Sequence, residues 1–450
     1  MKKTRQIAAL SMAVSMILMG CQGTANTETT AGAATSAQNA ETESSASDQT
    51  SGEAVELTIW FEGGDARLPF FEAAEAEMQK DYPNYSINCV TFDNSTFMTK
   101  VLQAVTATGG VDLVFNDASR ILEIDQQSNY GFEDLNSVLE SDEKKDLISE
   151  GDIKLSSSAG RLVVYPVNRT IAGLGVKTDV PGVEVSKETS PETWEEFIEL
   201  GTAYKNAGIN GFTMSLGDDP GQAFNLFLCG SGMSDVFLNG TPESQVEKNK
   251  QYFENIISVY AGENGFWDKD ATSEDFSAMY TKIQSGSEGM FRAGNWNVAG
   301  WDDPESGVGE YQVTTWPSLD GSGNSGLVLL NTRGFGVPQN SENKEAAKIF
   351  LKYVLAETPQ LKSFETMGSC MDLNVVDMDS LTKNQKIFFD SEVPMYPIDN
   401  YVAEISYYND IYDAYEKGLI NAFNSATTEE ITQNVEAIHS AINEVIAENK

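Results

Sequence analysis

The sequence predicts an α/β protein in which a largely parallel, doubly wound sheet is covered by helices. Strand and helix patterns alternate over residues 55–115, which is typical of consecutive βαβ units. The strand that ends this series, Val111–Phe115, is nearly all apolar, as expected for a strand buried on both faces. With 450 residues, the chain is long enough for two lobes, each with a core of its own.

The first elements follow from short local signals. Strand composition at 55–60 precedes a turn-like segment at 63–65 and then Pro69, a residue favoured in the first turn of a helix. Apolar residues at helical spacing continue until Asp81-Tyr82-Pro83 stops the helix. A second strand is predicted at 85–92, and a second helix runs from Phe97 to Gly109-Gly110 before the strand at 111–115.

Helices dominate the later part of the chain. An extended segment at 171–176 follows Pro166, where the chain is expected to leave the first lobe. Ser190 and Pro191 predict a helix start, with the serine as N-cap and the proline at the first helical position. Apolar residues at helical spacing predict further helices around 276–283, 347–354 and 431–445.

The charge balance excludes several functional classes. There are 29 basic and 68 acidic residues, a formal net charge of −39, so a nucleic acid partner is disfavoured by repulsion. The one histidine, His439, leaves no material for a His-ligated metal site or for a triad that needs a second candidate. We expect no metal and no cofactor, and we expect His439 on the surface of the C-terminal helix.

The N-terminus predicts export. Lys2, Lys3 and Arg5 precede an apolar stretch, 7–19, that is too short to span a bilayer. This stretch ends at Leu18-Met19-Gly20-Cys21, which resembles the bacterial lipobox. The resemblance implies that residues 1–20 are a lipoprotein signal peptide and that Cys21 is lipidated.

Residues 21–53 contain no aromatic residue and are rich in Thr, Ser, Ala and Glu. Such a segment cannot offset its ordering entropy by burial, so we expect a disordered polar tether. The folded part would then be held extracellularly, lipid-anchored at the outer face of the cytoplasmic membrane. Cys89, Cys229 and Cys370 allow at most one disulfide, and we expect them to be free, buried thiols.

Four segments in order resemble the extracellular solute-binding lipoproteins of ABC transporters, specifically their large sugar-binding family, family 1. They are the lipobox, Leu57–Trp60 with Asp112–Asp117, Ser190–Phe197, and Gly289–Trp296, and the likeness extends from residue 55 to about 370. It implies a two-lobed periplasmic-binding-protein-like fold, in which each lobe is a sheet flanked by helices and the lobes close about a hinge. It also implies a carbohydrate ligand in the interlobe cleft and ABC transporter permease subunits as partners.

The same resemblance implies that each lobe is built from discontinuous segments. The expected N-terminal lobe is 54–165 plus about 327–367, and the C-terminal lobe is 166–315 plus about 370–450. The chain would cross near Tyr165, near 316–326 and near Gly368. We expect a monomer.

Ligands of such sheets lie beyond the carboxyl ends of strands, here the polar segments 61–67 and 116–120. A sugar needs hydrogen-bond acceptors and forked donors around its ring and an aromatic face under it. We expect acceptors, amides, guanidinium groups and aromatic rings at the site; the candidates are Glu62, Asp65, Arg67, Asn116, Asp117, Asn295, Trp296, Asn331, Arg333 and Tyr396. By resemblance, Trp296 stacks on the sugar from the C-terminal lobe.

Structural roles compete with these assignments. Asp117 suits the N-cap of the following helix, Trp296 and Tyr396 suit a core, and Arg333 suits a salt bridge. We expect no enzyme and no catalytic residues, but two alternatives remain open. One is a binder of another solute, a polyamine or a peptide, whose binding would depend steeply on salt. The other is a glycoside hydrolase that uses paired carboxylates.

Overall fold

The computed structural model describes most of the chain after the predicted tether. The described residues are 54–185, 191–217, 220–232, 242–261, 265–398 and 408–449. The predicted signal peptide, Cys21, the predicted tether up to residue 53 and the expected cap Ser190 therefore lie outside the described residues.

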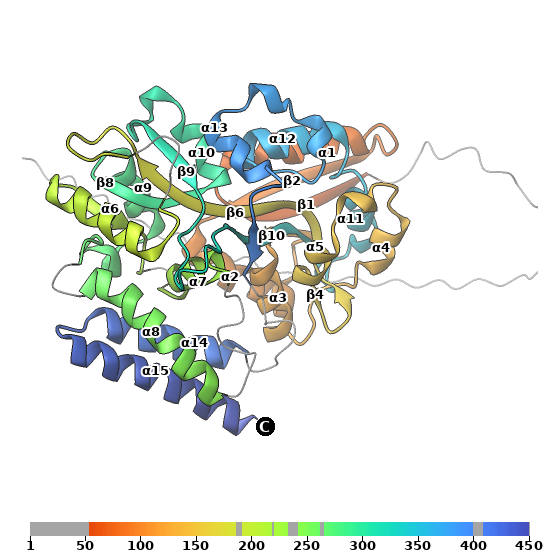
Figure 1. Cartoon of the computed structure of the whole chain (residues 1–450). Helices are drawn as coiled ribbons and strands as arrows, with labels where there is room; N and C mark the ends of the chain where they lie inside the picture. Colours follow the sequence, from red (N-terminus) through yellow and green to blue (C-terminus); the bar gives the residue numbers. More distant parts are fainter. Residues whose placement is uncertain are drawn as a thin grey trace, which may run out of the picture. The chain divides into compact units, whose positions relative to one another are not determined.

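One mixed sheet organises this part of the chain (Figure 1). Its path is β2-β1-β3-β10-β6-β8-β7, with β11 paired to β10 and β9 paired to β6. The bounds are β1 Val55–Glu62, β2 Tyr85–Phe92, β3 Leu113–Asp117, β6 Tyr165–Lys177, β7 Asn210–Thr213, β8 Glu288–Gly294, β9 Tyr311–Thr314, β10 Leu327–Gly336 and β11 Met395–Pro397. A separate hairpin joins β4 (Ser157–Ser158) to β5 (Arg161–Leu162).

Helices follow most of these strands. They are α1 Leu68–Met78, α2 Asn94–Gln103, α3 Ala118–Gln127, α4 Asn136–Ser141, α5 Glu150–Leu155, α6 Trp194–Asn206, α7 Pro220–Gly230, α8 Pro242–Ala261, α9 Phe276–Gln284, α10 Asn295–Trp301, α11 Lys344–Leu351, α12 Glu357–Met367, α13 Lys383–Lys386, α14 Tyr408–Phe423 and α15 Thr428–Glu448. A short 3-10 helix, η1 (Asp65–Arg67), joins β1 to α1. The predicted α/β class is confirmed.

The predicted early elements are confirmed with small shifts. The second strand has the bounds expected from the sequence, whereas β3 begins at Leu113 rather than Val111. The shift has a local cause, because the carboxylate of Asp112 accepts hydrogen bonds from the backbone N–H of Thr58 (2.9 Å) and from the hydroxyl of Ser341 (2.6 Å). Asp112 therefore ties the start of β3 to its neighbours with its side chain.

The predicted start of α6 is wrong. The helix begins at Trp194, and Pro191 lies before it rather than at its first position. Thr193 is the N-cap: its hydroxyl accepts from the backbone N–H of Glu196, whose side chain accepts from the backbone N–H of Thr193. This reciprocal capping box satisfies two helix-end donors, and its Thr-x-x-Glu pattern was available in the sequence.

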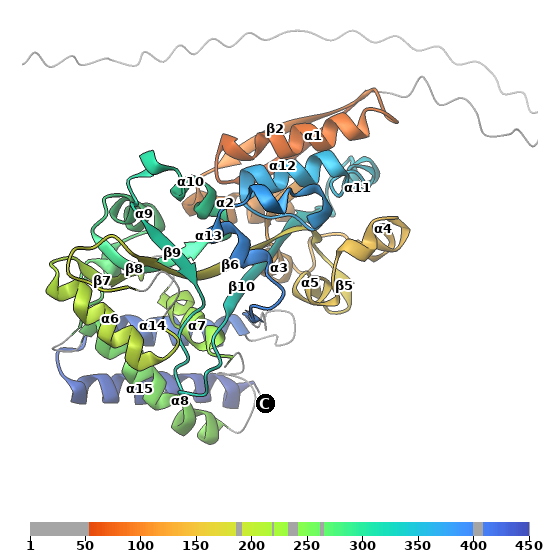
Figure 2. The same cartoon turned by 45° about the horizontal axis from the view of Figure 1, so that its top comes forward.

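The sheet buries both of its faces near β1 and β3. Leu57, Ile59 and Phe115 belong to a core that includes side chains from α1, α11 and α12. Val114 faces the opposite way, into a core with α2 and α3. Figures 1 and 2 show α1 and α12 together on one side of β1, away from α3.

A further core lies around β7, β8 and the C-terminal helices. It contains side chains from α6, α8, α14 and α15, and α15 contacts both α8 and α14 (Figure 1). The long strands β6 and β10 contribute to both regions: Val167 and Phe335 pack in the first core, whereas Ile171 and Val328 pack in this one. The two strands therefore connect the cores through continuous backbone.

The three cysteines of the described residues are free. Cys229 and Cys370 are buried, as predicted, whereas Cys89 is only partly buried. Burial raises the pKa of the Cys89 and Cys370 thiols to about 12, so neither is a ready thiolate nucleophile.

The expectation that His439 lies on the surface is wrong. Its side chain is on the buried face of α15, only 6 % exposed, and its ring contacts Phe253 of α8. Burial, reinforced by the positive charge of Lys250, lowers the pKa of His439 to about 4. The imidazole is therefore held neutral between helices.

We expect His439 to make the protein less stable as the pH falls from 6.5 to 4. In the unfolded chain the imidazole takes up a proton at its ordinary pKa of 6.5, whereas in the folded state it does so only near 4. The contribution of the neutral imidazole to the free energy of unfolding is therefore fully present above pH 6.5. It declines below that pH, by about 3 kcal/mol in all. Urea unfolding at pH 7 and pH 4 measures this loss, which His439→Gln should lack.

The exposed neighbour provides the control for this experiment. Ser440→Ala should keep the pH dependence of the unmodified protein. If His439→Gln lost as much stability on acidification as the unmodified protein, the assignment would be wrong.

Candidate functional site

The carboxyl ends of several strands face one short stretch of β6 and β10. On β10, Arg333 pairs with Asp117, the last residue of β3, and Val328 pairs with Tyr396 of β11. Since β3 is antiparallel and β11 parallel to β10, their carboxyl ends point toward each other across 330–332.

The register of β6 gives the same result on its other side. Asn168 pairs with Arg333, at the level of the end of β3, and Ala172 pairs with Gly294, the last residue of β8. At about 3.3 Å per residue, these two levels are about 13 Å apart along β6. The carboxyl ends of β3 and β8, which belong to different cores, therefore face each other diagonally across β10 and β6, which lie between them in the sheet.

Most of the predicted site residues lie around this stretch. Glu62, Asn116 and Asp117 are at the ends of β1 and β3, Asn331 and Arg333 are in β10, and Asp65 and Arg67 are in η1. From the other side come Asn295 and Trp296, which begin α10, and Tyr396 of β11. The predicted residues thus lie on elements from both sides of this stretch.

Ion pairs dominate the end of β1 and β3. Arg333 Nε and Nη2 both approach Asp117 Oδ1 at 2.8 Å, so the predicted salt bridge of Arg333 is present. Arg120 Nη1 contacts Glu62 Oε2 at 2.6 Å. Arg120 is not among the predicted site residues. Its position at the end of the polar segment 116–120 was the sequence signal that could have identified it.

Asn116 and Asp117 have different surroundings although they are neighbours. Asp117 is the N-cap residue of α3, but its side chain makes no cap hydrogen bond and pairs with Arg333 instead. Asn116 is 0 % exposed and accepts from the backbone N–H of Asp117 with Oδ1 at 2.7 Å. Its Nδ2 has no hydrogen-bond partner among the described residues.

Asn331 connects β10 to the start of α3. Its Nδ2 donates to the hydroxyl of Ser119 at 2.5 Å, and its Oδ1 accepts from the backbone N–H of Ser119 at 3.3 Å. The Thr170 hydroxyl donates to the Asn331 carbonyl oxygen at 3.2 Å. Asn331 therefore holds three elements together at the level where the strand ends face each other.

The side chain of Asn295 is used by the backbone. Its Oδ1 accepts from Ile171 N–H (3.1 Å), and its Nδ2 donates to the carbonyl oxygens of Arg169 (3.0 Å) and Gly368 (3.3 Å). Asn295 thus joins β6 to the end of α12 and has no free polar atom to offer a ligand. These backbone contacts differ from the ligand contact that the sequence analysis expects of Asn295.

Trp296 is partly buried and held by polar contacts. Its Nε1 donates to the hydroxyl of Tyr280 at 3.3 Å, and the guanidinium of Arg292 lies 5.4 Å from its ring centroid. The ring folds back over Gly294, where any Cβ would collide with it. Glycine at 294 therefore leaves the space that the indole of Trp296 occupies beside the strand end.

The two remaining predicted residues differ in their surroundings. Tyr396 is partly buried and lies over Gly326, where a Cβ would come within 2.6 Å of its ring. Asp65 is exposed in η1 and has no side-chain partner among the described residues. No group of His, Cys, Asp and Glu side chains in the described part of the chain is arranged to hold a metal ion.

Comparison with known proteins identifies the family. The family of bacterial extracellular solute-binding proteins matches residues 66–361. This chain belongs to that family. A comparison with curated protein sequences finds no significant match.

Solved structures of similar fold place this solute-binding protein among two-lobed binding proteins. Maltose-bound MalE3 of T. maritima has a TM-score of 0.69 at 17 % identity, covering 87 % of this chain and 100 % of that one. An ABC substrate-binding protein from Listeria monocytogenes in complex with cycloalternan has 0.69 at 15 %, with 88 % and 100 % covered. The GacH receptor of Streptomyces glaucescens, solved unliganded and with acarbose, has 0.69 at 16 %, with 88 % and 99 % covered.

At these identities the likeness establishes the predicted two-lobed, periplasmic-binding-protein-like fold. The recognition of this family from the sequence is confirmed. Among the described helices, none has both the length and the apolar character needed to cross a membrane.

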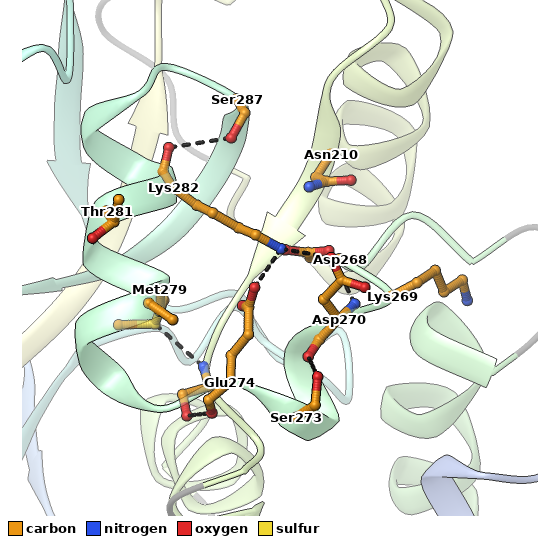
Figure 3. Close-up of polar contacts among 12 residues, drawn as sticks. Asn210, Asp268, Lys269, Asp270, Ser273, Glu274, Met279, Thr281, Lys282 and Ser287 are labelled. Atoms are coloured by element: carbon orange, nitrogen blue, oxygen red, sulfur yellow. Dashed lines mark hydrogen bonds and ion pairs between the residues drawn. The ribbon is translucent and has the colours of Figure 1, made fainter. Parts of the chain in front are cut away.

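A lysine, Lys282, stabilises the segment that follows strand β7. Beyond β7, the backbone N–H of Gly217 and the hydroxyl of Ser215 both donate to the carbonyl oxygen of Glu274. The side chain of Glu274 pairs with Lys282 of α9, which also contacts Asp268 (2.6 Å) and Asp270 (3.0 Å) (Figure 3). Although burial opposes the charge, these carboxylates raise the pKa of Lys282.

We expect Lys282→Met to destabilise the solute-binding protein by about 3 kcal/mol. The substitution leaves two carboxylates, Asp268 and Glu274, without their cation, and their side chains are only 6 % and 8 % exposed. Removing one partner of a buried pair costs about this much. Urea unfolding at pH 7 measures the change, and Lys417→Met, at a lysine 77 % exposed, should change stability by less than about 1 kcal/mol.

Proposed function

We propose that this protein captures a carbohydrate between its facing strand ends and delivers it to the permease of an ABC transporter. The observation that carries the proposal is the register of β6 and β10, which brings the ends of β3, β8 and β11 around residues 169–171 and 330–332. These ends supply carboxylates, guanidinium groups and a flat aromatic ring, the groups that a sugar's hydroxyls and apolar face require.

The names of the similar structures support a carbohydrate. These structures are described with maltose, cycloalternan and acarbose, and one of the proteins is called an ABC substrate-binding protein. Those ligands are properties of those proteins, and for this chain they indicate a class of solute. We propose the permease partner because the chain belongs to the family of extracellular solute-binding proteins and because one similar structure is named an ABC substrate-binding protein.

We propose the lobe division expected from the sequence: 54–165 plus about 327–367, and 166–315 plus about 370–450. The separate cores support a division within β6 and within β10, and their membership changes a few residues beyond the proposed bounds, between Val167 and Ile171 and between Val328 and Phe335. Asn295 would then act at the hinge, because it binds Arg169 and Gly368, which lie in two of the proposed crossings. Closure of the lobes would bring Trp296 toward Asp117.

We propose that the chain works as a lipid-anchored monomer at the outer face of the cytoplasmic membrane, with Cys21 as the lipidated residue. The lipobox-like residues 18–21 and the polar composition of 21–53 support an anchor and a tether. The match to an extracellular family supports the location.

The site favours binding over hydrolysis. A retaining or inverting glycosidase needs one carboxyl group that carries a proton to the leaving group. Glu62 and Asp117 are instead each held by an arginine. This arrangement suits acceptors of hydroxyl protons, and we propose that the protein is not an enzyme.

We expect Trp296→Ala to weaken carbohydrate binding by about 1 kcal/mol or more, since it removes the stacking surface. The ligand is found first by a thermal-shift screen of purified protein against a saccharide panel, and affinity is then measured by calorimetry. Tyr130→Ala is the control, because Tyr130 is an exposed aromatic residue, 50 % accessible, outside the site.

The same experiment tests the proposed function itself. Saccharides recovered unaltered after incubation, with a reversible rise in unfolding temperature, are the expected result. Release of shorter saccharides, or the absence of a shift with every member of the panel, would refute the proposal.

A further inference from the structure

Among the described residues, the polar cluster at the ends of β1 and β3 contains three guanidinium groups and two carboxylates. Arg333 pairs with Asp117 and Arg120 pairs with Glu62. Arg67 donates from Nη1 to the backbone carbonyl oxygen of Glu62, and its guanidinium has no carboxylate partner within hydrogen-bond distance among the described residues.

This local excess of positive charge contrasts with the strongly negative net charge of the chain. The chain has a formal net charge of −39, with 68 acidic residues, so acidic side chains are abundant. Burial and, after it, the charge of Arg333 lower the pKa of Arg67 to about 9, while the charges of Glu62 and Asp117 oppose this shift. A guanidinium removed from water without a counter-ion costs free energy, so its retention here calls for a partner.

The backbone holds Arg67 in a fixed position. Gly63 has φ of 94° and Gly64 has φ of 73°, both in the left-handed region that favours glycine. The guanidinium folds back onto this turn: a Cβ at position 63 would lie 2.5 Å from its central carbon. The glycine turn and the carbonyl oxygen of Glu62 therefore fix the guanidinium at the carboxyl end of β1, where ligands of this fold are expected.

A second unmatched donor lies on the neighbouring strand. Asn116 is fully buried at the end of β3, and its Nδ2 has no hydrogen-bond partner among the described residues. Buried donors without partners are rare in native proteins, and because Asn116 is 0 % exposed, its Nδ2 is enclosed by protein rather than open to a solute. The unmatched group that a solute can reach is the guanidinium of Arg67, which is only partly buried, so the complementary group is an acceptor with negative charge.

We propose that the carbohydrate bound by this protein is anionic and that Arg67 is the counter-ion of its acidic group. The inference rests on the proposed function and specifies the substrate class. The planar fork of a guanidinium matches the two oxygens of a carboxylate, as in a uronic acid, and also those of a sulfate or phosphate ester. A neutral sugar would leave Arg67 without a counter-ion, and a cationic ligand would find Glu62 and Asp117 already paired.

The test compares matched neutral and anionic saccharides by calorimetry on the purified protein. The probes are galactose with galacturonate, glucose with glucuronate, galactobiose with digalacturonate, and galactose 6-sulfate as the ester. We expect the anionic member of at least one pair to bind about tenfold more tightly than its neutral partner, as for a charge-assisted hydrogen bond. This preference should decrease between 50 mM and 500 mM salt.

Variants assign the preference to Arg67. Arg67→Gln should remove it, Arg67→Lys should retain part of it because the charge remains, and Lys80→Gln should leave it unchanged. Lys80 is a matched control because it is a cation in an exposed position, 66 % accessible, outside the cluster. Thermal unfolding verifies that each variant is folded, and the salt dependence of the unmodified protein remains informative if Arg67→Gln is not.

The outcomes separate the two proposals. Neutral members that bind as tightly as anionic ones, or a preference that survives in folded Arg67→Gln, would overturn this inference and leave carbohydrate capture intact. A failure of every saccharide in this set and in the wider panel, neutral and anionic, would overturn the proposed function and this inference with it. A preference for the sulfate over the uronates would support an anionic ligand and identify its acidic group as an ester.

Discussion

The structure depends on the hydrogen-bonded pair of strands β6 and β10. Backbone hydrogen bonds cannot be left unmade in a buried sheet, so this antiparallel pair fixes the level at which every neighbouring strand ends. Asp117 lies at the level of Arg333 and Asn168, and Gly294 lies at the level of Ala172. A change of register by one residue would turn the side chains of a whole strand to the opposite face. Register shifts occur in β10 beside Asn331 and Arg333, next to the stretch 330–332 where the strand ends face each other.

Side chains complete what this ladder begins. Asn295 ties β6 to the end of α12, and Asn331 ties β10 to the start of α3. Lys282 holds the segment that supports the loop beyond β7. Because these contacts position the strand ends from different elements, a ligand that bridges the ends would couple to the relative position of the lobes. This is the mechanical requirement of a protein that closes on its solute.

Charge distinguishes the candidate site from the rest of the molecule. In a strongly acidic protein, the ends of β1 and β3 collect three arginines, and two of them neutralise the neighbouring carboxylates. The glycine turn at 63–64 holds the third against the end of β1. Charges on the rest of the surface are screened over about 10 Å at ordinary ionic strength, so the local cluster rather than the net charge decides which solutes are favoured at the site.

The accuracy of sequence interpretation followed the range of the interactions involved. Strands β1 and β2 and helix α1 were predicted closely, because apolar periodicity and a stop at Pro83 act within one element. The start of α6 was misplaced through attention to Ser190 and Pro191 rather than to the Thr193–Glu196 box, an error of local chemistry. The burial of His439 was not predicted, because helical periodicity identifies the apolar face of α15 but does not show that α8 also packs against the residue at the margin of that face.

Local sequence patterns suffice to predict the α/β class and the strands that end in polar segments. They do so because strand alternation, helical spacing and turn residues are properties of neighbouring positions. The partners of the candidate site residues depend on tertiary contacts. In the part of the chain that the structure describes, Asn295 binds backbone groups, Arg120 pairs with Glu62, Arg333 pairs with Asp117, and Arg67 has no carboxylate partner. The partners of a side chain come from strands far away in the chain, and their relative level is set by the hydrogen-bond register of the assembled sheet.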